Sequence, residues 1–349
     1  MTPEPTRPTQ FGRIHPPDDA WLARQPAEPI LDPDLPIIDT HHHLWERPGH
    51  RYMLHDFLAD AGTGHNLVAS VFVECHAMYR AHGPEEMRPT GETEFVAGQA
   101  AMSDSGLYGA ARVAAGIVGF ADLTLGDRVE RVVEAHLRAG GGRFRGVRHS
   151  AAWDASPVIG NSQTATGPHL MMQPEFRAGL ARLTALGLSL DAWAFHPQLA
   201  DVVDLARAFP RATIVVGHVG GPLGYGPYTG KRDEVFAAWK AGVTALAKCG
   251  NTVMKLGGMM MRLGAYDYRT QPAPPSSAEL AALWRPYIEP CIELFGADRC
   301  MFESNFPVEK MGIGWAALWN AFKHIAARAS AGEKRALFSG TARRVYRLD

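Results

Sequence analysis

Short apolar runs alternate with longer amphipathic patterns from Pro36 to the end of the chain. Several runs are continuously apolar, as in LVASVFV and TIVVG, which is typical of parallel strands covered on both faces. The pattern predicts eight strands, at residues 36–40, 67–74, 113–121, 144–148, 189–194, 213–217, 253–256 and 300–303. It predicts helices between them at residues 127–139, 174–186, 198–209, 233–248 and 278–295, with a short helix around 92–101.

Eight strands separated by helices predict a parallel α/β fold, most simply a closed (β/α)₈ TIM barrel. An open doubly wound sheet is the alternative, but it needs a glycine-rich turn after the first strand, and histidines follow that strand here. Three connections are long, at residues 76–112, 150–173 and 257–277, and all leave the carboxyl ends of strands. We therefore expect long loops on the C-terminal face, where barrel enzymes keep their active sites.

The domain organisation follows from composition along the chain. Residues 1–35 are rich in proline and charge and predict an extended N-terminal arm, whereas residues 36–349 predict one barrel domain. The 349 residues are 46% hydrophobic, enough for a large core, and carry a net charge of −1 without a basic block. This argues against a nucleic-acid partner.

Other features narrow the class of protein further. We find no apolar run of membrane-spanning length and no secretory signal at the N-terminus, so we expect no membrane partner. The four cysteines lack Cys-x-x-Cys spacing and predict reduced thiols in a cytoplasmic protein. A homo-oligomer is compatible with the sequence.

Histidines follow the predicted strands at positions suited to metal binding. His41 and His43 share one face of the first strand, so that both rings can reach one ion, while His42 points the other way. Imidazoles after the first, fifth and sixth strands would complete a divalent metal site, with zinc as the first choice; the candidate ligands are His41, His43, His196 and His218. Such an ion lowers the pKa of a bound water, which can then attack an electrophilic carbon.

Other polar and aromatic residues at the strand ends are candidates for substrate binding and proton transfer. Arg148 could hold a substrate carboxylate in bidentate fashion. The candidate substrate-binding residues are Arg148, His149, Trp45, Tyr79, Trp193 and Lys255, and the candidate catalytic residues are Asp191, Glu303, Asn305 and His218. Ionisable groups are costly in a packed core, which favours a site at the mouth of the barrel.

Five motifs together resemble one known family. They are PIIDTHHHLW (36–45), GVRH (146–149), DAWAFHP (191–197), HVGGP (218–222) and FESNFP (302–307). In combination they are similar to the amidohydrolase-2 branch of the amidohydrolase superfamily, over roughly residues 30–349. The resemblance implies a (β/α)₈ barrel and a lactonase or a metal-dependent decarboxylase. It matches His41, His43 and His218 to metal ligands, with His196 near a fourth ligand position.

One position departs from the family pattern. Many members carry an aspartate at the end of the eighth strand, where this chain has Asn305. An amide does not take a proton at neutral pH and is a poorer metal ligand, so the departure implies a weakly bound or absent metal and a different proton carrier. Glu303, Asp191 and His218 are the candidates. Burial would raise the pKa of Glu303 and suit it to acid/base work, but pairing with Lys255 or Arg148 in a structural role is equally compatible with the sequence.

The leading functional prediction is a hydrolase that opens a small, carboxylate-bearing lactone or ester by water attack. The substrate would be a small anionic molecule held by Arg148. A metal-dependent decarboxylase of an aromatic or muconate-type acid is the first alternative. A binding barrel that has lost catalysis, suggested by Asn305, is the second.

Overall fold

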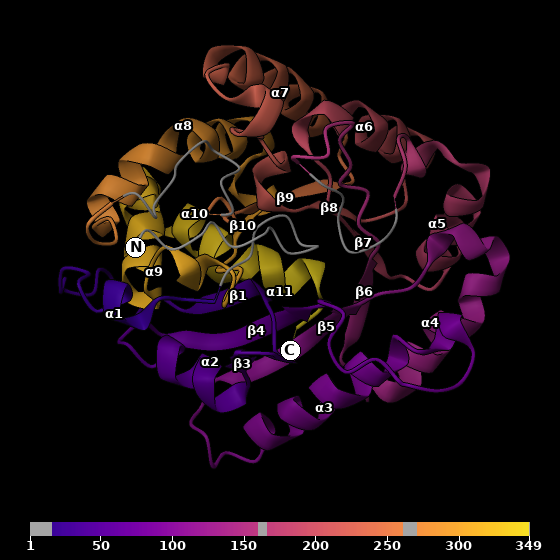
Figure 1. Cartoon of the computed structure of the whole chain (residues 1–349), viewed down its shortest axis with the longest axis horizontal. Helices are drawn as coiled ribbons and strands as arrows, with labels where there is room; N and C mark the ends of the chain where they lie inside the picture. The colour runs from indigo at the N-terminus through magenta and orange to yellow at the C-terminus, as the bar shows by residue number, and fades with distance from the viewer. Residues whose placement is uncertain (1–15, 160–165, 261–270, 349) are drawn as a thin grey trace.

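The computed structural model describes residues 16–159, 166–260 and 271–348. Eight parallel strands form a nearly closed barrel surrounded by helices, which confirms the predicted TIM-barrel fold (Figure 1). In their order around the barrel the strands are β1 (Ile37–His42), β4 (Leu67–Val73), β5 (Arg112–Gly119), β6 (Phe144–Arg148), β7 (Ser189–Ala192), β8 (Ile214–Val216), β9 (Thr252–Leu256) and β10 (Cys300–Phe302). All eight predicted strands are present, with ends that differ by at most two residues.

The segment after β10 joins the barrel back to β1. The backbone N–H of Asn305 donates to the carbonyl of His41 (2.7 Å), and the N–H of His43 donates to the carbonyl of Phe306 (2.8 Å). The side chain of Asp39 accepts hydrogen bonds from the backbone and hydroxyl of Ser304 (2.8 and 2.6 Å). These contacts fix the first and last strands relative to each other, and with them the side chains that follow.

The helices form an outer ring that covers the strands (Figure 1). Its members are α3 (Thr90–Asp104), α4 (Val129–Ala139), α5 (Pro174–Ala185), α6 (Leu199–Ala208), α7 (Arg232–Ala247), α8 (Ser277–Phe295) and α9 (Trp315–Ile325). Local sequence explains several of the helix starts: Pro174 occupies the first turn of α5, and Ser276 with Glu279 forms a capping box at α8. The pattern did not predict α9 or the short elements α1 (Asp19–Leu22), the hairpin β2 (Trp45–Arg47) and β3 (His50–Tyr52), α2 (Leu54–Ala61), α10 (Ala331–Arg335) and α11 (Thr341–Val345).

Two groups of apolar side chains pack on opposite faces of the strands. Phe72, Ile214 and Phe302 belong to the larger group, which lies beneath the helices. Their neighbours Val71, Val215 and Met301 point to the other face, into the barrel, as alternation along a strand requires. There they pack against side chains of α11 and the residues that follow it, Ala342, Val345, Tyr346 and Leu348.

The described part of the predicted N-terminal arm, residues 16–35, lies against the C-terminal half of the barrel. The indole N–H of Trp21 donates to the carbonyl of Gln271 (2.9 Å), and the amide of Gln25 donates to the carbonyl of Pro275 (2.9 Å). The N–H of Leu31 donates to the side chain of Asn320 in α9 (2.9 Å). Across the described residues, no helix combines the length and the apolar character needed to cross a membrane.

Candidate active site

Three consecutive histidines lie at the end of β1 (His41 and His42) and directly after it (His43). Of these, His41 and His43 face the inside of the barrel. Nε2 of His41 and Nε2 of His43 lie 3.3 Å apart, whereas His42 stacks on Phe57 on the outer face (ring centroids 4.3 Å). Burial lowers the pKa of His41 and His43 well below the usual value, and the nearby charges of Lys255 and Arg148 lower it further. Both rings are therefore neutral and have lone pairs available to bind a metal.

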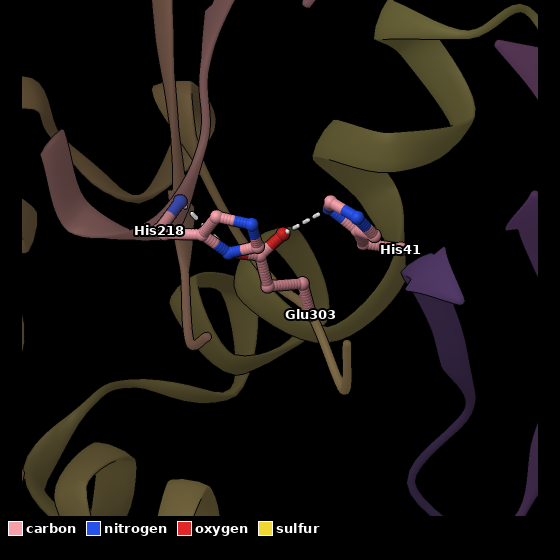
Figure 2. A group of neighbouring side chains, drawn as sticks. All are labelled: His41, His218 and Glu303. Atoms are coloured by element: carbon pink, nitrogen blue, oxygen red, sulfur yellow. Dashed lines mark hydrogen bonds and ion pairs between the residues drawn. The ribbon is translucent and has the colours of Figure 1, made fainter. Parts of the chain in front are cut away.

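Glu303 joins His41 to His218, although these three residues come from three different strand ends (Figure 2). Its Oε1 lies 2.8 Å from Nδ1 of His218 and accepts the backbone N–H of the same residue (2.9 Å), and its Oε2 lies 2.8 Å from Nδ1 of His41. All three residues are at most 2% exposed. We call His41, His43, His218 and Glu303 the histidine cluster.

These contacts differ from both alternatives that the sequence left open for Glu303. It does not pair with Lys255 or Arg148, because both of its oxygens face imidazoles. Burial alone would raise its pKa, but the contacts with His218 and His41 outweigh burial and hold the pKa well below the usual value. Glu303 is therefore an ionised partner of histidines and not a proton donor in the resting site.

The residues of the histidine cluster fit a divalent metal ion. His41, His218 and Glu303 each offer a ligand atom, and these atoms lie within 4.8 Å of one another. Nδ1 of His41 and Oε2 of Glu303 are buried and, despite their close approach, make no well-aligned hydrogen bond. Neutral imidazoles beside a carboxylate are a donor set that zinc accepts, so the chemistry of the site agrees with metal binding.

Arg148, at the end of β6, is mostly engaged by Glu74. Its Nε donates to Oε1 of Glu74 (2.7 Å), and its Nη2 donates to the Glu74 carbonyl. Nη1 lies 3.3 Å from Nε2 of His41. The predicted bidentate grip on a substrate carboxylate would have to displace these contacts, because one guanidinium edge already binds a buried acid.

Asp191 and Lys255 pair with each other inside the barrel. Nζ of Lys255 lies 2.8 Å from Oδ2 of Asp191, and the hydroxyl of Tyr346 donates to the same oxygen (2.8 Å). Asp191 is therefore held by a cation and a hydroxyl, which is a structural environment. Its catalytic role and the substrate-binding role of Lys255 stay predictions.

The predicted aromatic walls take different positions around the histidine cluster. Trp45 is fully buried and stacks on His43 (5.7 Å, interplanar angle 19°), so that it lies behind this ring. Trp193 is half-buried, and its ring centroid lies 4.5 Å from that of His218 with the two rings nearly perpendicular (86°). Tyr79 packs against His76 (5.0 Å) on the loop after β4.

His149 and His196 are not brought to the histidine cluster. Nδ1 of His149 accepts the N–H of Leu123 (3.1 Å), and Nδ1 of His196 accepts the N–H of Leu223 (3.3 Å). Burial lowers the pKa of both to about 4. His196, the predicted fourth ligand, lies four residues beyond the end of β7. The loop there turns its ring toward Tyr228 (5.1 Å) and away from the histidine cluster.

Glu309 is a site residue that the sequence interpretation missed. It is fully buried, and its carboxylate accepts hydrogen bonds from the N–H of Met260 (2.9 Å) and from Nδ2 of Asn305 (3.3 Å). Burial raises its pKa to about 8, against the lowering effect of these hydrogen bonds. The available signal was an acid four residues after Asn305, directly after the apolar residues 306–308.

Comparison with known proteins gives consistent findings. The amidohydrolase family model matches residues 38–348. The protein y4mH of Sinorhizobium fredii is 31% identical over 337 residues, 90% of this chain and 99% of that protein. An L-fucono-1,5-lactonase of Burkholderia multivorans is 28% identical, with 89% of this chain and 96% of that protein covered. A crystal structure of an amidohydrolase from Burkholderia multivorans with bound zinc superposes with a TM-score of 0.67 at 26% identity, covering 90% of this chain and 99% of that one.

Proposed function

The chain belongs to the amidohydrolase family, and we propose that it opens a small lactone by water attack at the histidine cluster. The proposal is carried by one observation: Glu303 holds His218 through Nδ1. A neutral ring that donates its Nδ1 hydrogen has its lone pair on Nε2. His218 is thereby prepared to accept a proton from an attacking water, and the ionised Glu303 would stabilise the resulting imidazolium.

The residues around His218 support the remaining steps of hydrolysis. A zinc ion held by His41 and His43 would supply a water of lowered pKa and polarise the lactone carbonyl. When water oxygen bonds to the carbonyl carbon, His218 takes the water proton. When the ring C–O bond breaks, His218 returns this proton to the departing alkoxide. Nη1 of Arg148, beside His41, is placed to donate to the oxyanion that develops in between.

A lactone fits this arrangement better than the alternatives. Lactone opening requires a water and a base, and the pair of His218 and Glu303 supplies the base. A relative that is 28% identical bears the name L-fucono-1,5-lactonase, which supports the same reaction class here. Glu74 already neutralises Arg148, so this arginine alone does not indicate that the substrate is an anion. An assay of charged and uncharged lactones determines which of them the protein prefers.

The test is a panel of 1,5- and 1,4-lactones, with and without a carboxylate, in which the purified protein is assayed by acid release. We expect turnover of at least one lactone and a fall in kcat of roughly 10²–10⁴-fold for His218→Asn, the effect typical of losing a general base. We expect His41→Ala to lose activity as well. His55→Ala is the control, because His55 is exposed on α2.

Two results would contradict the proposal. Full activity in His41→Ala would remove the histidine cluster from the reaction. Carbon dioxide release from an aromatic acid, without opening of any lactone, would assign the site to decarboxylation.

A further inference from the structure

The side-chain amide of Asn305 lies between a histidine and a buried acid. Its Oδ1 is 3.3 Å from Nε2 of His43, and its Nδ2 donates to Oε1 of Glu309 at 3.3 Å. Asn305 is 1% exposed and adopts a left-handed backbone conformation (φ 53°), which is uncommon outside glycine. The amide is therefore positioned by its backbone and by the hydrogen bond from Nδ2 to Glu309.

The atom that Oδ1 faces is a hydrogen-bond acceptor. Nδ1 of His43 lies 2.7 Å from the carbonyl of Val73, which can only accept, so Nδ1 carries the hydrogen and Nε2 has the lone pair. Nε2 of His41 lies 3.3 Å from Nε2 of His43. Nη1 of Arg148 donates to Nε2 of His41, so this atom is an acceptor too. The lone pairs of His41 and Asn305 thus both converge on that of His43.

Converging lone pairs repel one another unless a cation lies between them. Ligand atoms of a tetrahedral zinc site lie about 3.3 Å apart when each bond is about 2.0 Å long. Both separations, from Nε2 of His43 to Nε2 of His41 and from Nε2 of His43 to Oδ1 of Asn305, are 3.3 Å. The spacing is that of a metal site, and on metal binding Nη1 of Arg148 would give up its contact with His41.

We propose that the amide oxygen of Asn305 binds the same metal ion as Nε2 of His41 and His43, and that Glu309 is the positioning residue that turns this oxygen toward the ion. This inference rests on the metal-dependent part of the proposed function. The acidic group thus lies at Glu309, four residues after Asn305, and acts through the amide of Asn305. On this proposal Asn305 allows firm metal binding, whereas the sequence alone predicted a weakly bound or absent metal.

Glu309 can orient the amide in its ionised form, in which both of its oxygens accept hydrogen bonds. Oε2 accepts the N–H of Met260 (2.9 Å) while Oε1 accepts from Asn305. Glutamine has one side-chain oxygen, so in Glu309→Gln either Met260 or Asn305 loses its acceptor. If the oxygen stays on Met260, the new NH₂ group faces Asn305 and favours the flipped amide, with nitrogen toward His43.

The experiment measures metal affinity directly. Metal-free protein is titrated with Co²⁺, followed by visible absorption, and with Zn²⁺ against a chromophoric chelator. We expect Glu309→Gln to weaken binding roughly 10–100-fold, as is typical when a residue behind a ligand is lost, and Asn305→Leu to weaken it at least as much. In the double variant Asn305→Asp/Glu309→Gln, affinity should return, because a carboxylate at position 305 needs no orientation.

Glu92→Gln is the matched control, since Glu92 is also a buried acid that accepts two backbone N–H groups, those of Cys75 and Ala77. Wild-type affinity in Asn305→Leu would exclude Asn305 as a ligand. Wild-type affinity in Glu309→Gln, or no recovery in the double variant, would exclude Glu309 as the positioning residue. Absence of Co²⁺ and Zn²⁺ binding by the wild-type protein would overturn the inference, while lactone opening, assayed separately, would still decide the proposed function.

Discussion

Gly258 lets the loop after β9 approach the ring of His218. A Cβ atom built at this position would lie 1.8 Å from Nδ1 of His218, the atom that Glu303 binds. The backbone of Gly258 is also left-handed (φ 68°), which an alanine adopts only at a cost of roughly 1–2 kcal/mol. The added methyl group would therefore displace the ring of His218, the proposed base.

We predict that Gly258→Ala lowers kcat by about 10-fold or more, because the ring of His218 must move and lose its contact with Glu303. The measurement is steady-state kinetics on the best lactone, together with circular dichroism. Gly98→Ala is the control: it lies in α3, and nothing comes within 4 Å of a Cβ there. Unchanged kcat in folded Gly258→Ala would show that the position of this ring does not matter.

At this scale the sequence predicted what depends on neighbouring residues and missed what depends on distant ones. Strand alternation places His41 and His43 together and turns His42 away, as expected. The partners of Glu303 lie 85 and 262 positions away in the chain, and no local pattern reports on them. The same is true of Glu309, whose contact with Met260 joins two loops after different strands.

The C-terminal helix α11 is the element that fills the barrel beneath the site. Val345 and Tyr346 pack among inward-facing side chains such as Val71 and Val215, and Figure 1 shows α11 within the ring of strands. The hydroxyl of Tyr346 reaches Oδ2 of Asp191, which also binds Lys255. The helix thereby completes the surroundings of a buried ion pair.

We predict that Tyr346→Phe lowers the free energy of unfolding by roughly 1–3 kcal/mol, the cost of leaving a buried acceptor with one partner fewer. Urea denaturation measures this, with Tyr287→Phe as the control, a buried tyrosine of α8 that packs on Trp239 of α7. A large fall in kcat with unchanged stability would instead support the predicted catalytic role of Asp191.

The elements divide in the same way as the residues. The eight strands and the long helices between them were predictable, because continuous apolar runs and helical periodicity recur along the chain. Helix α11 was not, because its five residues, TARRV, carry too little pattern. The position of α11 depends on its packing against the inward-facing side chains of the barrel, and the local sequence carries no signal for these contacts.

Over the whole molecule, many histidines are buried as neutral rings. Burial lowers the pKa to about 3 for His42 and to about 4 for five others, His50, His65, His136, His149 and His196. In the unfolded chain these rings titrate near 6.5. The unfolded state therefore binds more protons between these values, so that stability is fully present above about pH 6.5 and is lost as the pH falls toward 4.

His136 allows this to be tested away from the histidine cluster. Its ring is buried in α4, with Nδ1 2.8 Å from the hydroxyl of Thr93 and Nε2 2.8 Å from the carbonyl of Phe120. His136→Gln removes one titrating group, so the slope of unfolding free energy against pH between 6.5 and 4 should fall by up to about 1.4 kcal/mol per pH unit. Urea titrations with a chelator present measure the slope, with exposed His82→Gln as the control. An unchanged slope in His136→Gln would mean that this ring is charged or exposed in the folded protein.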